Sequence, residues 1–162
     1  MLAVFIKELN SFLSSLIGYI VIIVFLIING LFLWVFPLDF NILNFGYASL
    51  DGLFVLAPFV FLFLIPAISM RSFSEEKRTG TIELLMTKPL TEIEIVIGKY
   101  LATIVLLILT LIPTFFYYYT VYSLGAPIGN MDIGATWGSY IGLLFLGSAF
   151  AAIGIFISSI TN

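Results

Sequence analysis

Charged residues are absent from four long stretches of the chain, and each stretch is rich in Leu, Ile, Val and Phe. The charges that bound these stretches are Glu8 and Asp39, Asp51 and Arg71, and Lys99 and Asp132, with the fourth stretch following Asp132. A helix needs about 20 predominantly apolar residues to cross the hydrocarbon core of a bilayer. The pattern therefore predicts four membrane-spanning helices, near residues 16–36, 52–70, 95–121 and 136–160.

The same stretches are apolar all round, without a regular alternation of apolar and polar residues. Strands of a membrane β-barrel would alternate in this way over about 10 positions. The sequence thus predicts an all-α membrane protein, a polytopic helical bundle that forms a single transmembrane domain over residues 1–162. Pro58, Pro66 and Pro113 fall inside the predicted spans, where proline favours kinks.

Residues 1–14 have a different periodicity from the spans. Their apolar residues recur at steps of three and four, with polar residues between them, at Leu2, Phe5, Ile6, Leu9, Phe12 and Leu13. This spacing predicts an amphipathic helix that lies in the membrane interface, with a simple extension of the first span as the alternative. The apolar run that follows is too long for a signal peptide and no small-x-small cleavage site follows it, so we expect a retained span.

Composition excludes most catalytic chemistry. Only 9% of the residues are charged, against about 25% in a soluble domain, so an integral membrane protein is the class that fits. The sequence contains no Cys and no His, which removes thiol chemistry, the commonest metal ligand and the commonest general base. No carboxylate pair lies within a span and no GxxxxGK[ST] motif occurs. We therefore expect no enzyme activity, no cofactor and no nucleic-acid partner, and any active transport must draw its energy from a partner protein.

The basic residues predict an orientation. All of them lie before the first span or around the connection between the second and third spans, at Lys7, Arg71, Lys77, Arg78, Lys88 and Lys99. The positive-inside rule then places the N-terminus and this connection in the cytoplasm. Trp34, Trp137 and the aromatic run FFYYYTVY (residues 115–122) fall at the opposite side of the membrane, where an interfacial aromatic belt is expected. A stacking platform for substrate is the alternative interpretation of these aromatic residues.

Small and polar residues inside the spans predict helix contacts. Gly138 and Gly142 form a GxxxG pair in the fourth span, and further Gly and Ala residues follow, which favours close packing within the chain or between chains. Asn29 is the strongly polar residue deep in the first span, and we expect it to hydrogen-bond another helix rather than bind an ion.

One compact block of mixed charge, RSFSEEKRTGTIELLMTKPL, occupies residues 71–90 within a predicted cytoplasmic connection over residues 71–94. Gly80 and Pro89 are expected to interrupt regular structure within this block. Between them, TIELLM (residues 81–86) fits a short helix that exposes apolar side chains. Thr91 and Glu94 have the spacing of a capping box at the start of the third span. The block is either a docking element for a partner or an ordinary solvated loop that carries the positive-inside charges.

Part of this block, SEEKRTGTIELLMTKPL, resembles the signature of the ABC-2 type exporter permeases. The matching positions are Glu76, Arg78, Gly80, Thr81, Glu83, Leu84, Leu85 and Pro89. KELNSFLSSLIGYIV (residues 7–21) and GIFISSIT (residues 154–161) agree with the same family. Over essentially its whole length, the chain is most similar to the permease subunits of gliding-motility ABC transporters, on NGLFLWVFP, GYASLDGLF, TGTIELLMTKPL and WGSYIGL.

The resemblance implies a multi-pass protein of the bacterial inner membrane that works with a second membrane subunit, alike or different, and with cytoplasmic ATPase subunits that bind the ATP. The loop helix would be a coupling helix seated on the ATPase, and residues 1–14 would be the family's interfacial helix. The residues implied in the ATPase contact are Glu76, Arg78, Gly80, Thr81, Ile82, Glu83, Leu85 and Met86. Among them, Ile82, Leu85 and Met86 would make apolar contacts, the charged residues would form ion pairs, and Gly80 would permit the turn. Family members usually have six spans, so this chain is expected to be truncated after the fourth.

These inferences give one leading hypothesis and two alternatives. The chain is expected to be a permease subunit of an exporter needed for gliding motility, which couples ATP hydrolysis by a partner to substrate movement. The first alternative is a structural membrane anchor that recruits a cytoplasmic partner without transport. A passive channel ranks third, because the sequence shows no charged or carbonyl-rich filter.

Overall fold

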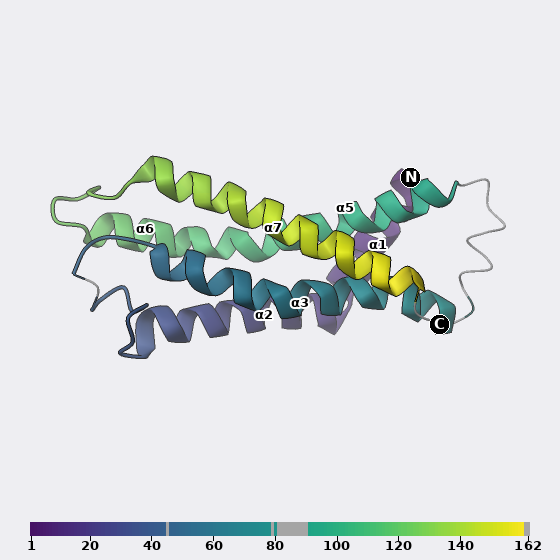
Figure 1. Ribbon diagram of the computed structural model, residues 1–162, viewed down its shortest axis with the longest axis horizontal. Helices are drawn as coiled ribbons and strands as arrows, with labels where there is room; N and C mark the ends of the chain where they lie inside the picture. The colour runs from purple at the N-terminus through teal and green to yellow at the C-terminus, as the bar shows by residue number, and fades with distance from the viewer. Residues whose placement is uncertain (45, 79, 81–90, 161–162) are drawn as a thin grey trace.

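The computed structural model describes residues 1–44, 46–78, 80 and 91–160, apart from the side chains of residues 75, 77 and 78. The regular structure of this part of the chain is entirely helical, which confirms the predicted all-α class (Figure 1). In chain order the elements are α1 (Leu2–Ser14), α2 (Leu16–Gly30), the π-helix η1 (Leu31–Val35), α3 (Asp51–Arg78), α5 (Glu92–Leu111), the 3₁₀ turn η2 (Ile112–Thr114), α6 (Phe115–Leu124) and α7 (Ile133–Ile160).

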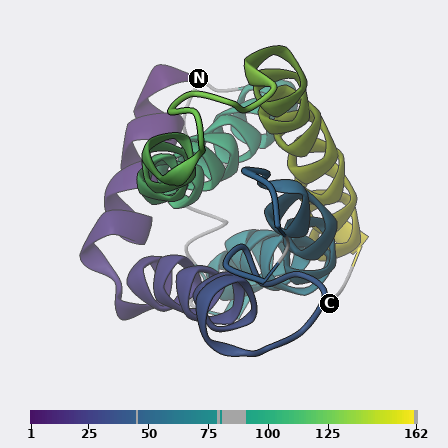
Figure 2. The same ribbon diagram turned by 90° about the vertical axis from the view of Figure 1, so that its left-hand side faces the viewer.

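Four of the described helical segments are long and apolar enough to cross a membrane, as the sequence predicts. They cover Leu16–Val35, Asp51–Ser74, Glu92–Leu124 and Ile133–Ile160. Figure 2 views the molecule along its long axis and shows these spans side by side as one bundle. Helix α3 runs on to Arg78, past the predicted end of the second span at residue 70, because no Gly or Pro lies between residues 71 and 79. Gly80 has a φ of +69°, a left-handed conformation that glycine adopts at little cost.

The predicted capping box begins α5. The Thr91 side chain accepts a hydrogen bond from the Glu94 backbone N–H at 3.4 Å, and the Thr91 backbone N–H donates to the Glu94 carboxylate at 3.2 Å. These bonds satisfy backbone donors that the first turn of a helix would otherwise leave without partners. The third span therefore starts at a position that the sequence specifies locally.

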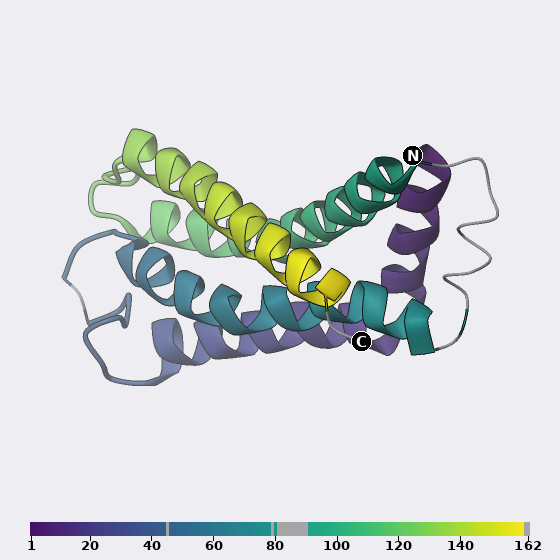
Figure 3. The ribbon, with the colours of Figure 1, turned by 45° about the vertical axis from the view of Figure 1, so that its right-hand side comes forward.

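The first helix is a separate element and not an extension of the first span. Between α1 and α2 the backbone of Ser15 is extended, with φ −91° and ψ 145°. Gly18 permits the sharp bend, because a Cβ at this position would collide with the carbonyl of Phe12. As a result α1 lies across the ends of the longer helices (Figure 3). Its position in the membrane interface stays a prediction.

Helix α7 packs closely on α3 and α5 through small residues, but not through the predicted GxxxG pair. A Cβ at Gly154 would collide with the Ser69 hydroxyl of α3, and one at Gly147 would collide with Leu107 of α5. Gly138 and Gly142 have open space within 4 Å instead. The contact face of α7 is therefore turned away from these two glycines. The core beside it includes a stacked pair, Phe25 and Phe61, whose ring centroids are 4.8 Å apart.

The expectation for Asn29 is wrong, whereas the kinks expected at Pro58 and Pro66 stay a prediction. Asn29 is fully buried, but its amide donates to the carbonyl of Phe25 in the same helix at 2.8 Å, so the expected bond to another helix is not the one that forms. Helix α3 continues through Pro58 and Pro66. Pro113 does mark a break, since it lies in the 3₁₀ turn between α5 and α6.

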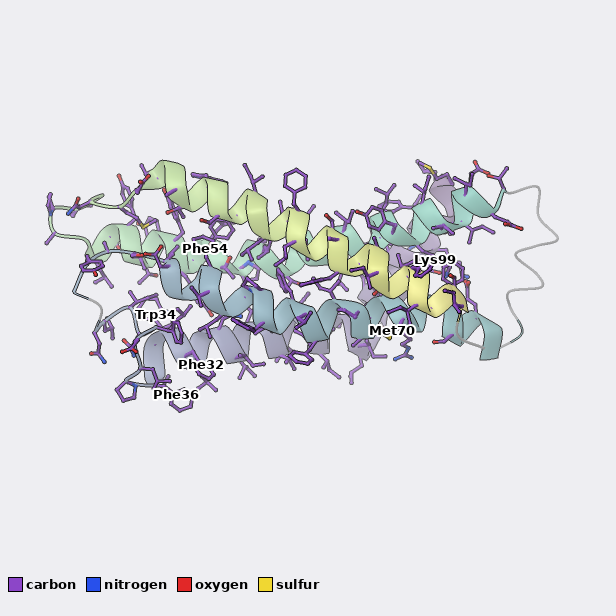
Figure 4. The ribbon with its side chains drawn as sticks, viewed as in Figure 1. Phe32, Trp34, Phe36, Phe54, Met70 and Lys99 are labelled. Carbon is purple, nitrogen blue, oxygen red and sulfur yellow. The ribbon has the colours of Figure 1, made fainter. Side chains whose placement is uncertain are left out.

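The two ends of the bundle differ in composition. One side of the bundle contains α1, the last turns of α3 and α7 and the first turn of α5, and we call it the charged end (Figure 1). The opposite side contains the connections over residues 36–50 and 125–132, and we call it the aromatic end. At the aromatic end Trp34 lies against Tyr117 and Trp137 against Tyr118, with ring centroids 6.1 and 6.3 Å apart. Figure 4 shows Trp34 and Lys99 at opposite ends. The belt is thus on the side away from the basic residues, as expected, while its location outside the cytoplasm stays a prediction.

Candidate functional site

Helices α1, α3 and α5 meet at the charged end around one fully buried lysine. Lys99 belongs to the second turn of α5 (Figure 4). Its relative exposure is 0%. The residues that surround it with polar groups come from the other two helices: Lys7 and Glu8 from α1, and Ser72 and Glu76 from α3. We call these five residues the Lys99 cluster. It joins segments that are up to 91 residues apart in the chain.

The ammonium group of Lys99 has an unusually complete set of partners. Its Nζ lies 2.9 Å from Glu8 Oε1, 2.8 Å from Glu76 Oε2 and 2.9 Å from the Ser72 carbonyl, and the Ser72 hydroxyl lies 3.2 Å away. The ring of Phe73 lies 4.8 Å from Nζ, in cation–π range. A buried charge is tolerated only when it is paired and its hydrogen bonds are satisfied. Lys99 meets both conditions within this chain.

Lys7 is the solvent-exposed cation of the network. Its Nζ donates to Glu76 Oε1 at 2.6 Å and lies 4.0 Å from Glu8 Oε1. The Lys7 side chain is 52% exposed, whereas those of both glutamates are 9% exposed. Two ammonium groups therefore face two carboxylates, and Glu76 bridges the buried lysine and the exposed one.

The charge of Glu76 depends on these partners. Burial by itself raises the pKa of the Glu76 carboxyl, but hydrogen bonds from Lys7 and Lys99 and the attraction of both ammonium groups outweigh it and hold the pKa below its ordinary value. Glu76 is consequently ionised at neutral pH. Both ion pairs need an ionised carboxylate, so the charge of Glu76 supports the link between Lys7 and Lys99.

Close backbone packing brings α1 within reach of Lys99. Gly98 precedes Lys99, and a Cβ at Gly98 would lie 3.1 Å from the Cβ of Val4 on α1. Val4, Glu8 and Phe12 form the buried face of α1, at steps of four residues. A side chain at position 98 would push α1 away, so the glycine allows Glu8 to reach the lysine.

A second polar contact fixes α7 to α3 beside the cluster. The Ser158 hydroxyl donates to the carbonyl of Met70 and accepts from the backbone N–H of Phe73 at 3.2 Å. Helices α1, α3, α5 and α7 are therefore joined at the charged end by packing or polar contacts.

The predicted coupling residues divide into two groups. Glu76 belongs to the Lys99 cluster, Arg78 is the last residue of α3, and Gly80 makes the turn that the sequence predicted. The remainder, Thr81, Ile82, Glu83, Leu85 and Met86, lie outside the described residues. Contact of this set with an ATPase stays a prediction, and Glu76 is already held by Lys7 and Lys99 inside the chain.

Sequence reasoning did not find the Lys99 cluster. It treated Lys99 as one of the positive-inside charges near a solvated connection, and the structure shows instead a buried residue inside the segment Glu92–Leu124. It also placed Glu8 among the polar residues of an amphipathic helix, although Glu8 lies on the buried face. One feature of the sequence could have indicated the cluster. Glu8 and Lys99 carry opposite charges, and each lies at the end of an apolar segment.

The fold is that of a polytopic helical membrane protein, and its charged end forms a polar junction at one end of the spans. A family model described as ABC-2 family transporter protein matches residues 2–162. The chain therefore belongs to the ABC-2 transporter family, whose members are membrane components of transporters and not enzymes by themselves. Such permeases normally work with an ATPase partner and another membrane subunit. Neither the curated proteins nor the solved structures gave a match.

Proposed function

We propose that this chain is the membrane-spanning permease subunit of an ABC-2 exporter of the gliding-motility type, which moves its substrate across the inner membrane by using ATP hydrolysed by a cytoplasmic partner. Membership of the ABC-2 family supports the permease role. The sequence has no nucleotide-binding motif, which agrees with ATP being bound by the partner. A second membrane subunit, identical or different, would complete the pathway.

The observation that carries this proposal is the position of the Lys99 cluster relative to the loop. Residues 79–91 connect α3 to α5, and the coupling helix is predicted within them. The cluster ties α1 to both of the helices that flank this connection, through Glu76 on one side and Lys99 on the other. A movement of the loop would thus act on α1, α3 and α5 together.

Rigidity at this point suits a mechanism that transmits force. ATP-driven closure of the partner would displace the loop, and the buried ion pairs would prevent α3 and α5 from moving past α1 independently. The contacts of Ser158 and Gly154 would carry the displacement into α7. The spans would then tilt as a unit at the charged end, while the aromatic end opens or closes.

The experiment uses the chain co-expressed with the ATPase of its transporter. A variant with Glu83→Ala and Leu85→Ala removes one charged and one apolar contact of the predicted coupling helix. We expect it to insert normally but to lose co-purification of the ATPase, or to retain the complex and lose stimulation of ATP turnover. Asn44→Ala, an exposed residue in the connection over residues 36–50, serves as the control.

Co-purification and ATP stimulation that are unchanged in the double variant would refute the coupling helix. If the wild-type chain binds a cytoplasmic protein that hydrolyses no ATP, the permease proposal fails and the membrane-anchor alternative replaces it.

A further inference from the structure

The buried apolar residues of the bundle form separate cores along its length, and two of these cores meet near the aromatic end. Every span contributes to the core nearer that end, which we call the aromatic-end core, through Leu33, Leu53, Tyr117 and Tyr140. Every span also contributes to the next core, which we call the central core, through Phe25, Ala57, Leu111 and Leu143. Each span therefore crosses from one core to the other.

In the first span, the crossing coincides with a buried polar residue and a change of helix type. Phe25, Asn29 and Leu33 follow one another at steps of four, which places Asn29 between the two cores. Asn29 is fully buried, and its Oδ1 accepts no hydrogen bond within the part of the chain that the structure describes. The π-helix η1 begins two residues later, and such turns are rare within α-helices and frequent at functional sites.

The third span also changes helix type where it crosses. Leu111 belongs to the central core, Tyr117 packs against the aromatic-end core, and the 3₁₀ turn η2 with Pro113 lies between them. The two irregular turns are neighbours in space. The Tyr117 hydroxyl lies 3.5 Å from the carbonyl of Leu26, and the centroids of the Tyr117 and Trp34 rings are 6.1 Å apart.

Helix α3 remains regular, but one of its backbone hydrogen bonds cannot form at the crossing. Leu53 lies in the aromatic-end core and Ala57 in the central core. Pro58 has no backbone N–H, so the carbonyl of Phe54 lacks its helical donor between these two residues. Phe54 itself packs against both cores.

In α7, a glycine marks the crossing. Gly142 lies between Tyr140 of the aromatic-end core and Leu143 of the central core, and the space around it is open. Glycine in a helix interior weakens the helix, because it gains more conformational freedom than other residues when the helix opens. All four spans thus have a weak point at the level where the cores meet.

We propose that Asn29, Pro58, Pro113 and Gly142 mark a hinge level, at which the aromatic-end part of the bundle bends relative to the rest. Helices bend at prolines and π-turns because their backbone hydrogen bonds are interrupted there. The unsatisfied oxygen of Asn29 contributes, since it weakens the packing that would otherwise join the two cores. Bending at this level would open or close the aromatic end while the Lys99 cluster keeps α1, α3 and α5 together. The hinge is a property of the chain alone and does not rest on the proposed coupling to an ATPase.

The test measures distances between spin labels by pulsed electron paramagnetic resonance, on the purified full chain in lipid nanodiscs without an ATPase. The sequence contains no Cys, so labels attach only to introduced cysteines. The first pair, Val35→Cys with Ile133→Cys, joins exposed positions at the aromatic end, and the second, Tyr19→Cys with Phe156→Cys, joins exposed positions on the other side of the hinge level. We expect a broader distance distribution for the first pair.

Variants at the hinge level separate bending from fraying of the helix ends. Pro58→Ala restores the missing backbone donor and should narrow the distribution of the aromatic-end pair towards the width of the second pair. Pro66→Ala is the matched control, because it makes the same change in the same helix beside Gly154, away from the hinge level, and should leave the distribution unchanged.

Asn29→Leu replaces the buried amide by an apolar side chain of similar size and should also narrow the distribution, without any change in the backbone. Each variant is first required to elute as the wild type on size exclusion. If Pro58→Ala does not meet this requirement, Asn29→Leu decides.

Equal widths for the two label pairs in the wild type would overturn the hinge. Equal narrowing by Pro58→Ala and Pro66→Ala, or a width that neither Pro58→Ala nor Asn29→Leu reduces, would also overturn it. Because the measurement contains no ATPase, a refutation of the coupling helix would leave the hinge standing, and the reverse holds as well.

Discussion

The charged end and the aromatic end hold the same bundle together by different forces. At the charged end, the ion pairs of the buried Lys99 with Glu8 and Glu76 join α1, α3 and α5. At the aromatic end, ring contacts and neutral hydrogen bonds predominate, such as those of Tyr140 with Thr114 and Phe54. A buried ion pair is intolerant of losing one partner, whereas ring packing adjusts to small changes. The charged end is therefore suited to transmit movement and the aromatic end to accommodate it.

The largest expected effect comes from removing the buried ammonium group. Lys99→Met leaves Glu8 without its hydrogen-bonded cation and Glu76 with Lys7 alone, and we expect a loss of about 3–5 kcal/mol in the free energy of unfolding. Denaturant unfolding of the purified protein in detergent micelles measures it. Lys7→Met is the matched control and should cost much less, because Lys7 is half exposed. Equal costs for the two lysines would show that burial does not set the strength of this junction.

A smaller effect is expected from the close packing of α7 near the charged end. Gly154→Leu forces a side chain into the space of Ser69 and should destabilise the protein by about 1–3 kcal/mol, as overpacking does. Gly142→Leu adds the same side chain on the open face of α7 and should be nearly neutral. Melting temperatures in detergent compare the two. If Gly142→Leu is the more damaging variant, α7 packs on its neighbours by the opposite face.

At the aromatic end, Tyr140→Phe removes a hydroxyl that lies 3.0 Å from the Thr114 hydroxyl and donates to the Thr114 carbonyl at 3.2 Å. Thr114 still donates to the carbonyl of Leu111, so no buried donor is left without a partner. We expect a cost of about 0.5–1.5 kcal/mol, that of one neutral hydrogen bond. The same unfolding measurement applies. A cost as large as that of Lys99→Met would remove the distinction between the two ends.

The smallest expected effect is the pH dependence of the stability that Glu76 contributes at the charged end. The pKa of Glu76 in the folded protein lies below its ordinary value of 4.5. Ionised Glu76 therefore contributes stability fully above about pH 4.5, and this contribution is lost as the pH falls through the lowered folded pKa. The stability difference between wild type and Glu76→Gln should be constant from neutral pH to about 4.5 and shrink below it. A difference that shrinks between pH 7 and 6 would contradict the assigned direction.

Local signals made much of the fold predictable. The four spans follow from uninterrupted apolar stretches, and the start of α5 from the Thr91–Glu94 capping box. The turn at Gly80 and the separation of residues 1–14 from the first span were also recognisable. These features depend on neighbouring residues alone, which explains why one sequence was enough.

The rest required knowledge of which helix faces meet. Hydropathy treats Lys99 as a charge near the end of a span, and nothing within α5 reveals that Glu8, 91 positions away, lies opposite it. Helical spacing likewise could not tell the open face of Gly138 and Gly142 from the packed face of Gly147 and Gly154. Asn29 looked like an interhelical donor, but the carbonyl of Phe25 in its own helix was the partner. Contacts between distant segments decided each case.

The central claim is that the Lys99 cluster binds α1 to α3 and α5, the helices on either side of the connection over residues 79–91. A double-mutant cycle on Glu8 and Lys99 tests it most directly, with Glu8→Gln, Lys99→Met and the double variant compared by denaturant unfolding. Residues in one buried network couple by about 0.5–3 kcal/mol. We predict that the double variant is more stable than the sum of the single losses implies, by an amount in this range. Additive losses, with no coupling between Glu8 and Lys99, would contradict the account.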